Sequence, residues 1–290
     1  MKLSEVLRSV KNSEVRRRVE FVVGLHLRLR LIVDAELNNL KYFSKGTNDL
    51  VTSLDLKVEQ FLTEKIKKAF PEDSFLCEES GSTLGESGFI HVIDPIDLTR
   101  NLSTGEQFLS LYTLMYDLNP VFSIEQGFRP KYFIFGISRV GNFRKAGNFV
   151  TTLPQIKLEN SFSYTVLHNF SVVQCSKKRK TEWGTFRDCI REVLTGELDA
   201  FVLSLDCFPF FAWDYLPSLH LLSNQDIEVT LLPKGDLTIS RDGILRMGNK
   251  PLQTVLAVRK SKKTQFLSLL ENNEEFNRFI KHHMDNHSIA

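Results

Sequence analysis

The amino-acid sequence predicts an α/β (α+β) fold, a layered sandwich of helices and sheets, on three observations. Apolar residues recur at helical spacing near the N-terminus, a second apolar helical face follows at 54–70, and segments rich in β-formers fill much of 107–174. We therefore expect an N-terminal half, residues 1–150, in which paired helices lie against a large, mostly antiparallel sheet. The C-terminal half, residues 151–290, is expected to hold a smaller mixed sheet.

The two predicted helical regions near the N-terminus both have one apolar face. In the first region the apolar residues at helical spacing are Leu3, Val6, Leu7, Val10, Val15, Val19, Val22 and Val23. In the second they are Leu54, Val58, Phe61, Leu62, Ile66 and Phe70. Thr52 or Ser53 can cap the start of the second helix, and Pro71 is expected to stop it.

The predicted strands are short segments rich in Phe, Tyr, Val and Ile, separated by Gly or Pro. Residues 89–93 form one strand, which is expected to end abruptly at Asp94-Pro95, and further strands are predicted at 107–116, 121–126, 131–140, 163–174 and 198–203. Helices are predicted at 183–194 and directly after Trp213-Asp214. The last twenty residues are polar and are predicted to form a helix with a frayed end.

Composition limits the class of protein. The chain has 290 residues, of which 42% are hydrophobic and 25% charged, and this is typical of a soluble globular protein. A formal net charge of +2 gives no general reason to expect a nucleic-acid or membrane partner. Residues 19–33 are interrupted by Arg28 and Arg30, and residues 1–20 lack an apolar core, so we expect neither a membrane span nor a signal peptide. We expect a cytoplasmic protein whose widely spaced cysteines are free thiols.

Acidic residues stand at the edges of four predicted elements. Asp49 and Asp55 flank a helix start, Glu78-Glu79 follows an apolar segment, Asp94 and Asp97 leave a strand, and Asp214 lies at a helix start. Taken singly, each has a structural explanation as a helix cap, a surface pair or a turn. Taken together, they offer the oxygen ligands that Mg²⁺ prefers.

The segment Asp94-Pro95-Ile96-Asp97-Leu98-Thr99 carries the strongest chemical signal. Because proline stiffens the turn, two carboxylates and the Ile96 carbonyl can be aimed at one point. Two Mg²⁺ ions about 3.5–4 Å apart can hold a phosphate, activate water and stabilise the leaving oxygen. Thr99 lies where a new helix is expected to begin, and the start of a helix suits phosphate binding.

These motifs resemble the inositol monophosphatase family in order and approximate spacing. The matching strings are Asp49-Leu-Val-Thr-x-x-Asp55, Glu78-Glu79-Ser80, Asp94-Pro95-Ile96-Asp97-x-Thr99 and Trp213-Asp214. The resemblance is dense from about residue 45 to 110 and returns at about 184–235. The superfamily includes 3′-phosphoadenosine 5′-phosphate phosphatases and fructose-1,6-bisphosphatases. The resemblance implies a layered αβαβα sandwich, as in the phosphatases of this family. It also implies a Mg²⁺-dependent phosphatase that uses two or three ions and is inhibited by lithium.

The resemblance also implies roles for individual residues. Glu78, Asp94 and the Ile96 carbonyl would bind one Mg²⁺, and Asp94, Asp97 and Asp214 a second, with a weaker third ion near Glu78. Asp55 and Thr99 would orient the attacking water for in-line displacement without a phosphoenzyme, Glu78 would also serve catalysis, and Asp49 would support this region. The substrate-binding residues would be Asp97, Leu98, Thr99, Gly184, Thr185 and Asp214.

The chain departs from the family pattern at four places. Leu98 replaces a glycine, which matters if the position needs a positive φ or a very close approach of substrate. Tyr215-Leu216-Pro217-Ser218-Leu219 replaces a run of small residues, although proline is tolerated in a first helical turn. Cys207 stands where inositol monophosphatases have a glutamate that contacts inositol, and Phe186 follows Gly184-Thr185 where a small residue is usual. The last two departures make inositol phosphate a doubtful substrate. In contrast, the number of residues from Thr99 to Gln107-Phe108 equals that in inositol monophosphatases and favours inositol phosphate, since the phosphoadenosine phosphatases are typically one residue longer here.

The resemblance predicts a hydrolase acting on a small phosphate monoester: an inositol phosphate, a sugar phosphate or 3′-phosphoadenosine 5′-phosphate. A catalytically impaired family member, acting as a binding or regulatory protein, is the alternative. The basic run 177–180 is expected to be a solvated loop, or else a contact for a second phosphate or a nucleotide. Lys45 either approaches the metal site or lies in an exposed turn, and His282, His283 and His287 are expected on the surface. A homodimer is compatible with the resemblance, but the sequence does not fix the oligomeric state.

Overall fold

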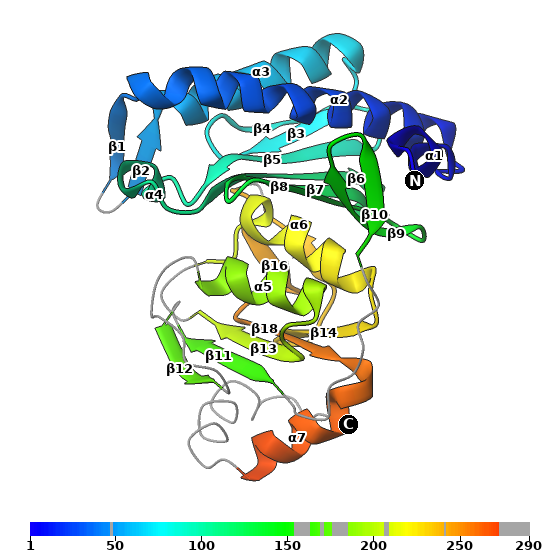
Figure 1. Cartoon of the computed structure of the whole chain (residues 1–290), viewed down its shortest axis with the longest axis vertical. Helices are drawn as coiled ribbons and strands as arrows, with labels where there is room; N and C mark the ends of the chain where they lie inside the picture. The colour runs from blue at the N-terminus through cyan, green and yellow to red at the C-terminus, as the bar shows by residue number, and fades with distance from the viewer. Residues whose placement is uncertain are drawn as a thin grey trace. The chain divides into compact units, whose positions relative to one another are not determined.

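The computed structural model describes residues 1–46, 49–153, 163–168, 171–175, 185–205, 209–240 and 242–272. The chain, coloured by residue number in Figure 1, divides into two compact units. Unit 1 comprises Met1–Thr152 and Trp213–Leu221, and unit 2 comprises Leu153–Ala212 and Leu222–Ala290. The short stretch that carries Asp214 therefore belongs to unit 1, although it is encoded far beyond the rest of that unit.

The helices of unit 1 follow the predicted apolar faces. They are α1 (Leu3–Arg8), α2 (Ser13–Glu36), the 3₁₀ turn η1 (Leu37–Asn39) and α3 (Ser53–Ala69), with the hairpin β1 (Tyr42–Gly46) and β2 (Asp49–Thr52) between η1 and α3. Asn12 caps α2 by accepting hydrogen bonds from the backbone N–H groups of Glu14 and Val15. Thr52 caps α3, as the sequence predicted, and forms a reciprocal capping box with Asp55.

An eight-stranded sheet lies beneath α2 and α3 (Figure 1). Its strands are ordered β10-β9-β8-β7-β6-β5-β3-β4, and every pair is antiparallel except β3–β5. Their bounds are β3 (Ser74–Cys77), β4 (Gly81–Thr83), β5 (Phe89–Asp97), β6 (Phe108–Tyr116), β7 (Asn119–Arg129), β8 (Tyr132–Ile137), β9 (Gly141–Ala146) and β10 (Phe149–Thr152). The mostly antiparallel sheet is as predicted.

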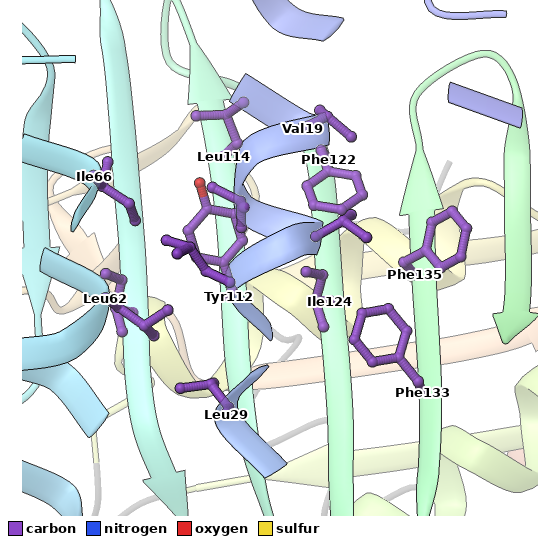
Figure 2. Packing of buried hydrophobic residues seen from close by; sticks show 14 of the residues in the cluster. Val19, Leu29, Leu62, Ile66, Tyr112, Leu114, Phe122, Ile124, Phe133 and Phe135 are labelled. Atoms are coloured by element: carbon purple, nitrogen blue, oxygen red, sulfur yellow. The ribbon is translucent and has the colours of Figure 1, made fainter. Parts of the chain in front are cut away.

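The main core of unit 1 fills the space between this sheet and its two long helices. Figure 2 shows side chains from α2, α3, β6, β7 and β8 meeting there, and its labelled residues are Val19, Leu29, Leu62, Ile66, Tyr112, Leu114, Phe122, Ile124, Phe133 and Phe135. Each fully buried side chain of this size contributes about 1.5–3 kcal/mol to the stability of the fold. Alternate residues of β6 and β7, among them Thr113 and Ser123, point to the opposite face of the sheet.

A buried polar network also ties α2 to the sheet. Arg18 donates to both carboxylate oxygens of Asp73, at 2.7 and 2.8 Å. His91 Nε2 lies 2.9 Å from Asp73, and its Nδ1 lies 2.6 Å from the Tyr112 hydroxyl. The guanidinium of Arg18 also stacks over Phe89, 3.8 Å from the ring centroid. Because each buried polar group has a partner, the network adds specificity without leaving an unsatisfied charge.

Unit 2 has a five-stranded mixed sheet ordered β12-β11-β13-β18-β14, in which only β11 and β13 are parallel. The strands are β11 (Tyr164–His168), β12 (Ser171–Cys175), β13 (Ala200–Ser204), β14 (Ile227–Leu232) and β18 (Thr254–Arg259). A small sheet contains β15 (Leu237–Ile239), β16 (Leu245–Met247) and β17 (Lys250–Pro251). The helical elements are α5 (Thr185–Thr195), η2 (Lys260–Lys262) and α7 (Lys263–Asn272), while α6 (Ala212–Ser223) is shared between the units.

Three boundaries differ from the predictions. The strand expected to end at Asp94-Pro95 continues to Asp97 as β5, because a bulge lets Asp94 pair with Leu111 and Asp97 with Leu109. The single strand predicted at 163–174 is the antiparallel pair β11 and β12. The helix expected to begin near Thr99 begins only at Asn101, as the four-residue α4 (Asn101–Thr104). Such a short helix provides no helical phosphate site.

The α/β fold class is confirmed. Cys77 and Cys189 are buried free thiols, as expected. Within the described ranges, none of the helices combines the length and the apolarity that a bilayer crossing requires. The helix expected in the last twenty residues falls mostly outside the described residues, which end at 272.

Candidate functional site

Three predicted acidic residues come together in unit 1. Asp94 and Asp97 lie at the end of β5, and Asp214 lies in the first turn of α6. One carboxylate oxygen from each lies within 4.8 Å of the others. Asp94 is buried, and the other two are half-buried. Carboxylate oxygens at this separation fit a hard divalent cation such as Mg²⁺, whose oxygen ligands lie about 2.0–2.1 Å from the ion.

The bulge in β5 explains how one strand presents two carboxylates. Pro95 and Ile96 lie between the paired residues Asp94 and Asp97, so the strand bends at that point. Ser110 donates its hydroxyl to the Asp94 carbonyl at 3.2 Å, which holds the bend against β6. Proline fits here because a bulged residue does not need to donate a ladder hydrogen bond.

Glu78 follows β3, the parallel neighbour of β5, and its backbone N–H donates to the Ile93 carbonyl at 3.1 Å. Burial raises the pKa of the Glu78 carboxyl well above its usual range, and the charge of Asp214 raises it further. A hydrogen bond with Asp94 acts in the opposite direction. Glu78 therefore interacts with Asp214 and Asp94, and a bound cation would relieve the repulsion between Glu78 and Asp214.

Lys45 lies beside this acidic group rather than in an isolated turn. Its Nζ atom is 2.6 Å from a Glu79 carboxylate oxygen and 3.7 Å from Glu78. Glu79 also donates its backbone N–H to the Glu59 carboxylate at 2.9 Å. Sequence reasoning did not single out Glu59. The available signal was a second carboxylate four residues after Asp55, next to the buried apolar face of α3.

Asp55 and Thr99 form the second part of the site. The Thr99 hydroxyl lies 2.9 Å from Asp55 Oδ1 and 2.7 Å from the Ile96 carbonyl oxygen, and both can accept its proton. The other oxygen of Asp55 accepts from the hydroxyl and the backbone N–H of Thr52. Burial raises the pKa of the Asp55 carboxyl, while these hydrogen bonds from Thr52 and Thr99 oppose the shift. The pair is therefore fixed in place and contains a carboxylate that is more basic than an exposed one.

Leu98 adopts the left-handed conformation, with φ 64°. A leucine in place of glycine was expected to matter if the position needed a positive φ, and it does. The left-handed region brings Cβ close to the following carbonyl oxygen, which costs about 1–2 kcal/mol for a non-glycine residue. The Leu98 carbonyl accepts from the Asn101 backbone N–H at 2.8 Å, which holds the turn closed. The turn beside Asp97 is therefore strained.

Helix α6 forms where it was predicted, but Pro217 lies inside it rather than in its first turn. The helix begins at Ala212, so Pro217 is its sixth residue. It removes the hydrogen bond that residue 217 would donate to the Trp213 carbonyl. Asp214 stays within the first turn, where the partial positive charge of a helix N-terminus favours a carboxylate.

For two other predicted site residues the structure gives the element alone. Thr185 begins α5 in unit 2, and Asp49 begins β2 in unit 1. Gly184, Cys207, residues 177–180 and the three C-terminal histidines lie outside the described residues. Their predicted roles remain predictions.

Comparison with known proteins gives a family match to part of the chain. The model of the inositol monophosphatase family matches residues 14–124. Nus factor SuhB of Haemophilus influenzae is 40% identical over 62 residues, which are 21% of this chain and 23% of that protein. The putative Nus factor SuhB of Neisseria meningitidis is 39% identical over 70 residues, 24% of this chain and 27% of the relative. The matched segments thus span about a quarter of these curated relatives.

Solved structures resemble the chain over most of its length. An IMPase/NADP phosphatase complexed with Mg²⁺ and phosphate has a TM-score of 0.64 at 17% identity, covering 90% of this chain and 97% of that one. The extragenic suppressor protein suhB from Bartonella henselae has a TM-score of 0.61 at 18% identity, covering 90% and 100%. At these identities the likeness shows the fold alone. In sequence over residues 14–124, and in fold over about nine tenths of its length, the chain resembles the inositol monophosphatase family, as its acidic motifs predicted.

Proposed function

We propose that the chain is a Mg²⁺-dependent phosphatase that hydrolyses a small phosphate monoester. The observation that carries this proposal is the convergence of the Asp94, Asp97 and Asp214 carboxylates in unit 1. The family match to residues 14–124 and the phosphatases among the structures of similar fold support a phosphatase superfamily. The reaction and the substrate are the further content of the proposal.

The donor set fits Mg²⁺. Asp94, Asp97, Asp214 and Glu78 would hold the ions with carboxylate oxygens, which hard cations prefer to nitrogen or sulfur. The Ile96 carbonyl would be a further ligand, because its oxygen has two lone pairs and the Thr99 hydroxyl uses at most one. When bound, such ions polarise a phosphoryl group and lower the pKa of a coordinated water.

The chain's own residues supply the proton transfer. With its proton directed to Asp55, the Thr99 oxygen has a lone pair free to accept a hydrogen bond from an attacking water. A proton leaving that water can pass to Thr99 as Thr99 passes its own to Asp55. The hydrogen bonds from Thr52 hold Asp55 in place for this step. General-base assistance of this kind contributes about 10²–10⁴-fold to a rate.

Substrate choice stays open among inositol phosphate, a sugar phosphate and 3′-phosphoadenosine 5′-phosphate. Leu98, Thr99, Asp97 and Asp214 would contact the phosphate, while Gly184 and Thr185 would contact the rest of the substrate. Structures of similar fold include a dual-specific IMPase/NADP phosphatase bound with D-inositol-1-phosphate, which favours testing inositol phosphate and nucleotide substrates together. A cytoplasmic location, a homodimer and lithium inhibition are corollaries of the resemblance.

Phosphate release from a panel of monoesters, with Mg²⁺ and with a chelator, tests the proposal. The panel should contain inositol 1-phosphate, a sugar phosphate and 3′-phosphoadenosine 5′-phosphate. We expect turnover of at least one compound with Mg²⁺ and none with the chelator. Asp94→Asn should abolish this turnover, because it removes a ligand shared by both predicted ions. If Asp94→Asn keeps its rate at saturating Mg²⁺, the metal assignment is wrong.

A binding or regulatory protein is the second candidate function. Two observations favour it: the strained Leu98 in the turn beside Asp97, and relatives that carry the name Nus factor. On this reading the cluster would still bind Mg²⁺, but no monoester would be turned over. The panel therefore separates the two candidates when Mg²⁺ binding is measured on the same sample. Binding of Mg²⁺ without release of phosphate from any monoester would support the function of a binding or regulatory protein.

A further inference from the structure

The third carboxylate of the cluster depends on the position of one helix. Asp94 and Asp97 are held together by β5, whereas Asp214 is contributed by α6. Local chain geometry cannot place Asp214 next to the other two, so contacts of α6 with distant parts of the chain must do so. Within the described part of unit 1, side-chain hydrogen bonds connect the last two turns of α6 to the sheet face opposite α2 and α3.

His220 makes two of these contacts, one with each ring nitrogen. Its Nδ1 lies 2.9 Å from the hydroxyl oxygen of Ser123 in β7. Its Nε2 lies 2.8 Å from the hydroxyl oxygen of Ser138, directly after β8. His220 is only 4% exposed, and Ser123 is fully buried. The His220 ring therefore bridges β7 and the turn that follows the neighbouring strand, β8.

The surrounding hydroxyl groups allow every hydrogen bond to be satisfied in one arrangement. Ser138 donates to the Pro120 carbonyl at 2.8 Å, so its oxygen accepts from His220 Nε2–H. Nδ1 then accepts a hydrogen bond from the hydroxyl group of Ser123. The Ser123 oxygen can in turn accept from Thr113, 2.9 Å away on β6. A neutral imidazole with one donor and one acceptor nitrogen thus completes a chain of hydrogen bonds across three neighbouring parts of the sheet.

Two further features bear on the placement of α6. Asn142 donates to the Leu221 carbonyl, which fixes the backbone one residue after His220. Pro217 removes one internal hydrogen bond from α6 between Asp214 and His220. A helix weakened in this way depends more on contacts outside itself, and the sheet supplies them.

We infer that His220 is a positioning residue, which fixes α6 on the eight-stranded sheet and thereby holds Asp214 at metal-binding distance from Asp94 and Asp97. This inference rests on the proposed function of the acidic cluster. His220 does not touch the cation or the substrate. It acts through the helix, in the way that groups around a metal site set the orientation of the ligands.

Calorimetric titration of the whole chain with MgCl₂ tests the inference, at a temperature well below the unfolding midpoint of every variant. His220→Leu keeps the side-chain size but removes both hydrogen bonds, and we expect about tenfold or greater loss of Mg²⁺ affinity. His220→Gln retains a donor and an acceptor and should remain within about threefold of the wild type. Rescue by glutamine distinguishes positioning by hydrogen bonds from simple filling of space.

Leu29→Ala is the control for lost stability. Leu29 is fully buried on α2, on the other face of the sheet, and its truncation should destabilise the unit without moving α6. It should leave Mg²⁺ affinity unchanged. The inference is overturned if His220→Leu binds Mg²⁺ as tightly as the wild type, or if Leu29→Ala loses as much affinity. If the wild-type chain itself binds no Mg²⁺, the proposed function fails and takes this inference with it.

Discussion

The hydroxyl of Thr99 lies 2.9 Å from the carboxylate of Asp55 and joins the turn after β5 to the first turn of α3. Asp55 also belongs to the capping box of that helix, so its position is set by the fold rather than by a substrate. The pair is therefore ready before substrate binds, and Thr99 is the member that can be changed with less effect on α3.

Thr99→Val should remove the proton relay while keeping the shape of the side chain. We expect kcat to fall by about 10²–10⁴-fold, because valine can neither donate to Asp55 nor accept from water. Thr99→Ser keeps the hydroxyl and should retain most of the activity. Steady-state kinetics with the best substrate of the panel, alongside Mg²⁺ titration, provide the check. Equal rates for the valine and serine variants would remove Thr99 from the mechanism.

Leu98→Gly should be more stable than Leu98→Ala. Both variants remove the leucine side chain beyond Cβ, but only glycine adopts φ 64° without strain. We expect a difference in the free energy of unfolding of about 1 kcal/mol in favour of glycine. Urea unfolding of the two variants measures it. If alanine proves equally stable, the positive φ of Leu98 carries no cost.

Asp214→Asn should uncouple stability from Mg²⁺. Without divalent ions, removing one of the crowded carboxylates relieves repulsion, so the variant should be at least as stable as the wild type. Added Mg²⁺ should raise the Tm of the wild type, since it binds the folded state alone, and should raise that of the variant much less. Thermal unfolding with and without MgCl₂ gives the comparison. The surface substitution Asp188→Asn should respond like the wild type.

The contribution of His26 and His220 to folding stability should decline between pH 6.5 and pH 4. Burial lowers the pKa of both groups to about 4 from 6.5. In this window each of the two histidines binds more protons in the unfolded chain than in the folded chain, so its contribution is complete above pH 6.5 and falls as the pH drops towards 4. Each histidine can account for roughly 3 kcal/mol over the whole window.

Urea unfolding at several pH values checks this slope. His220→Gln and His26→Gln should each flatten it, because the replacement does not titrate. Asp73 acts in a separate, more acidic window. Hydrogen bonds from Arg18 and His91 outweigh its burial and hold its pKa below the usual range, so its contribution is present above about pH 3.9 and is lost below that. If a glutamine variant keeps the pH slope of the wild type between pH 4 and 6.5, the histidine that it replaces is not buried in its neutral form.

Asp73→Asn should be strongly destabilising. It leaves the buried Arg18 guanidinium without its bidentate carboxylate, and breaking such a pair costs about 3–5 kcal/mol. Glu14→Gln removes the other, half-exposed carboxylate that contacts Arg18 and should cost about 1 kcal/mol or less. Urea unfolding of both variants measures the contrast. Similar losses of unfolding free energy for the two variants would show that the buried pair of Arg18 and Asp73 stabilises the fold no more than the more exposed pair of Arg18 and Glu14.

Local features of the fold were predictable because they depend on neighbours in the chain. The apolar faces of α2 and α3 and the cap at Thr52 follow from residues within one or two helical turns. The end of β5 was not predictable in this way. Asp94-Pro95 looks like a strand end, and only pairing with β6 shows that the proline lies in a bulge. The same holds for Pro217, whose place inside α6 depends on where that helix begins.

The sequence by itself determined the acidic motifs, their order and the family that they resemble. The tertiary structure alone decided that Asp214 meets Asp94 and Asp97, that Leu98 takes a positive φ, and that Glu59 and His220 lie where they can support the site. The physical reason is the range of the interactions. Caps and periodicity arise between residues a few positions apart, whereas these contacts require distant segments to pack in one register, and that packing depends on the whole of unit 1.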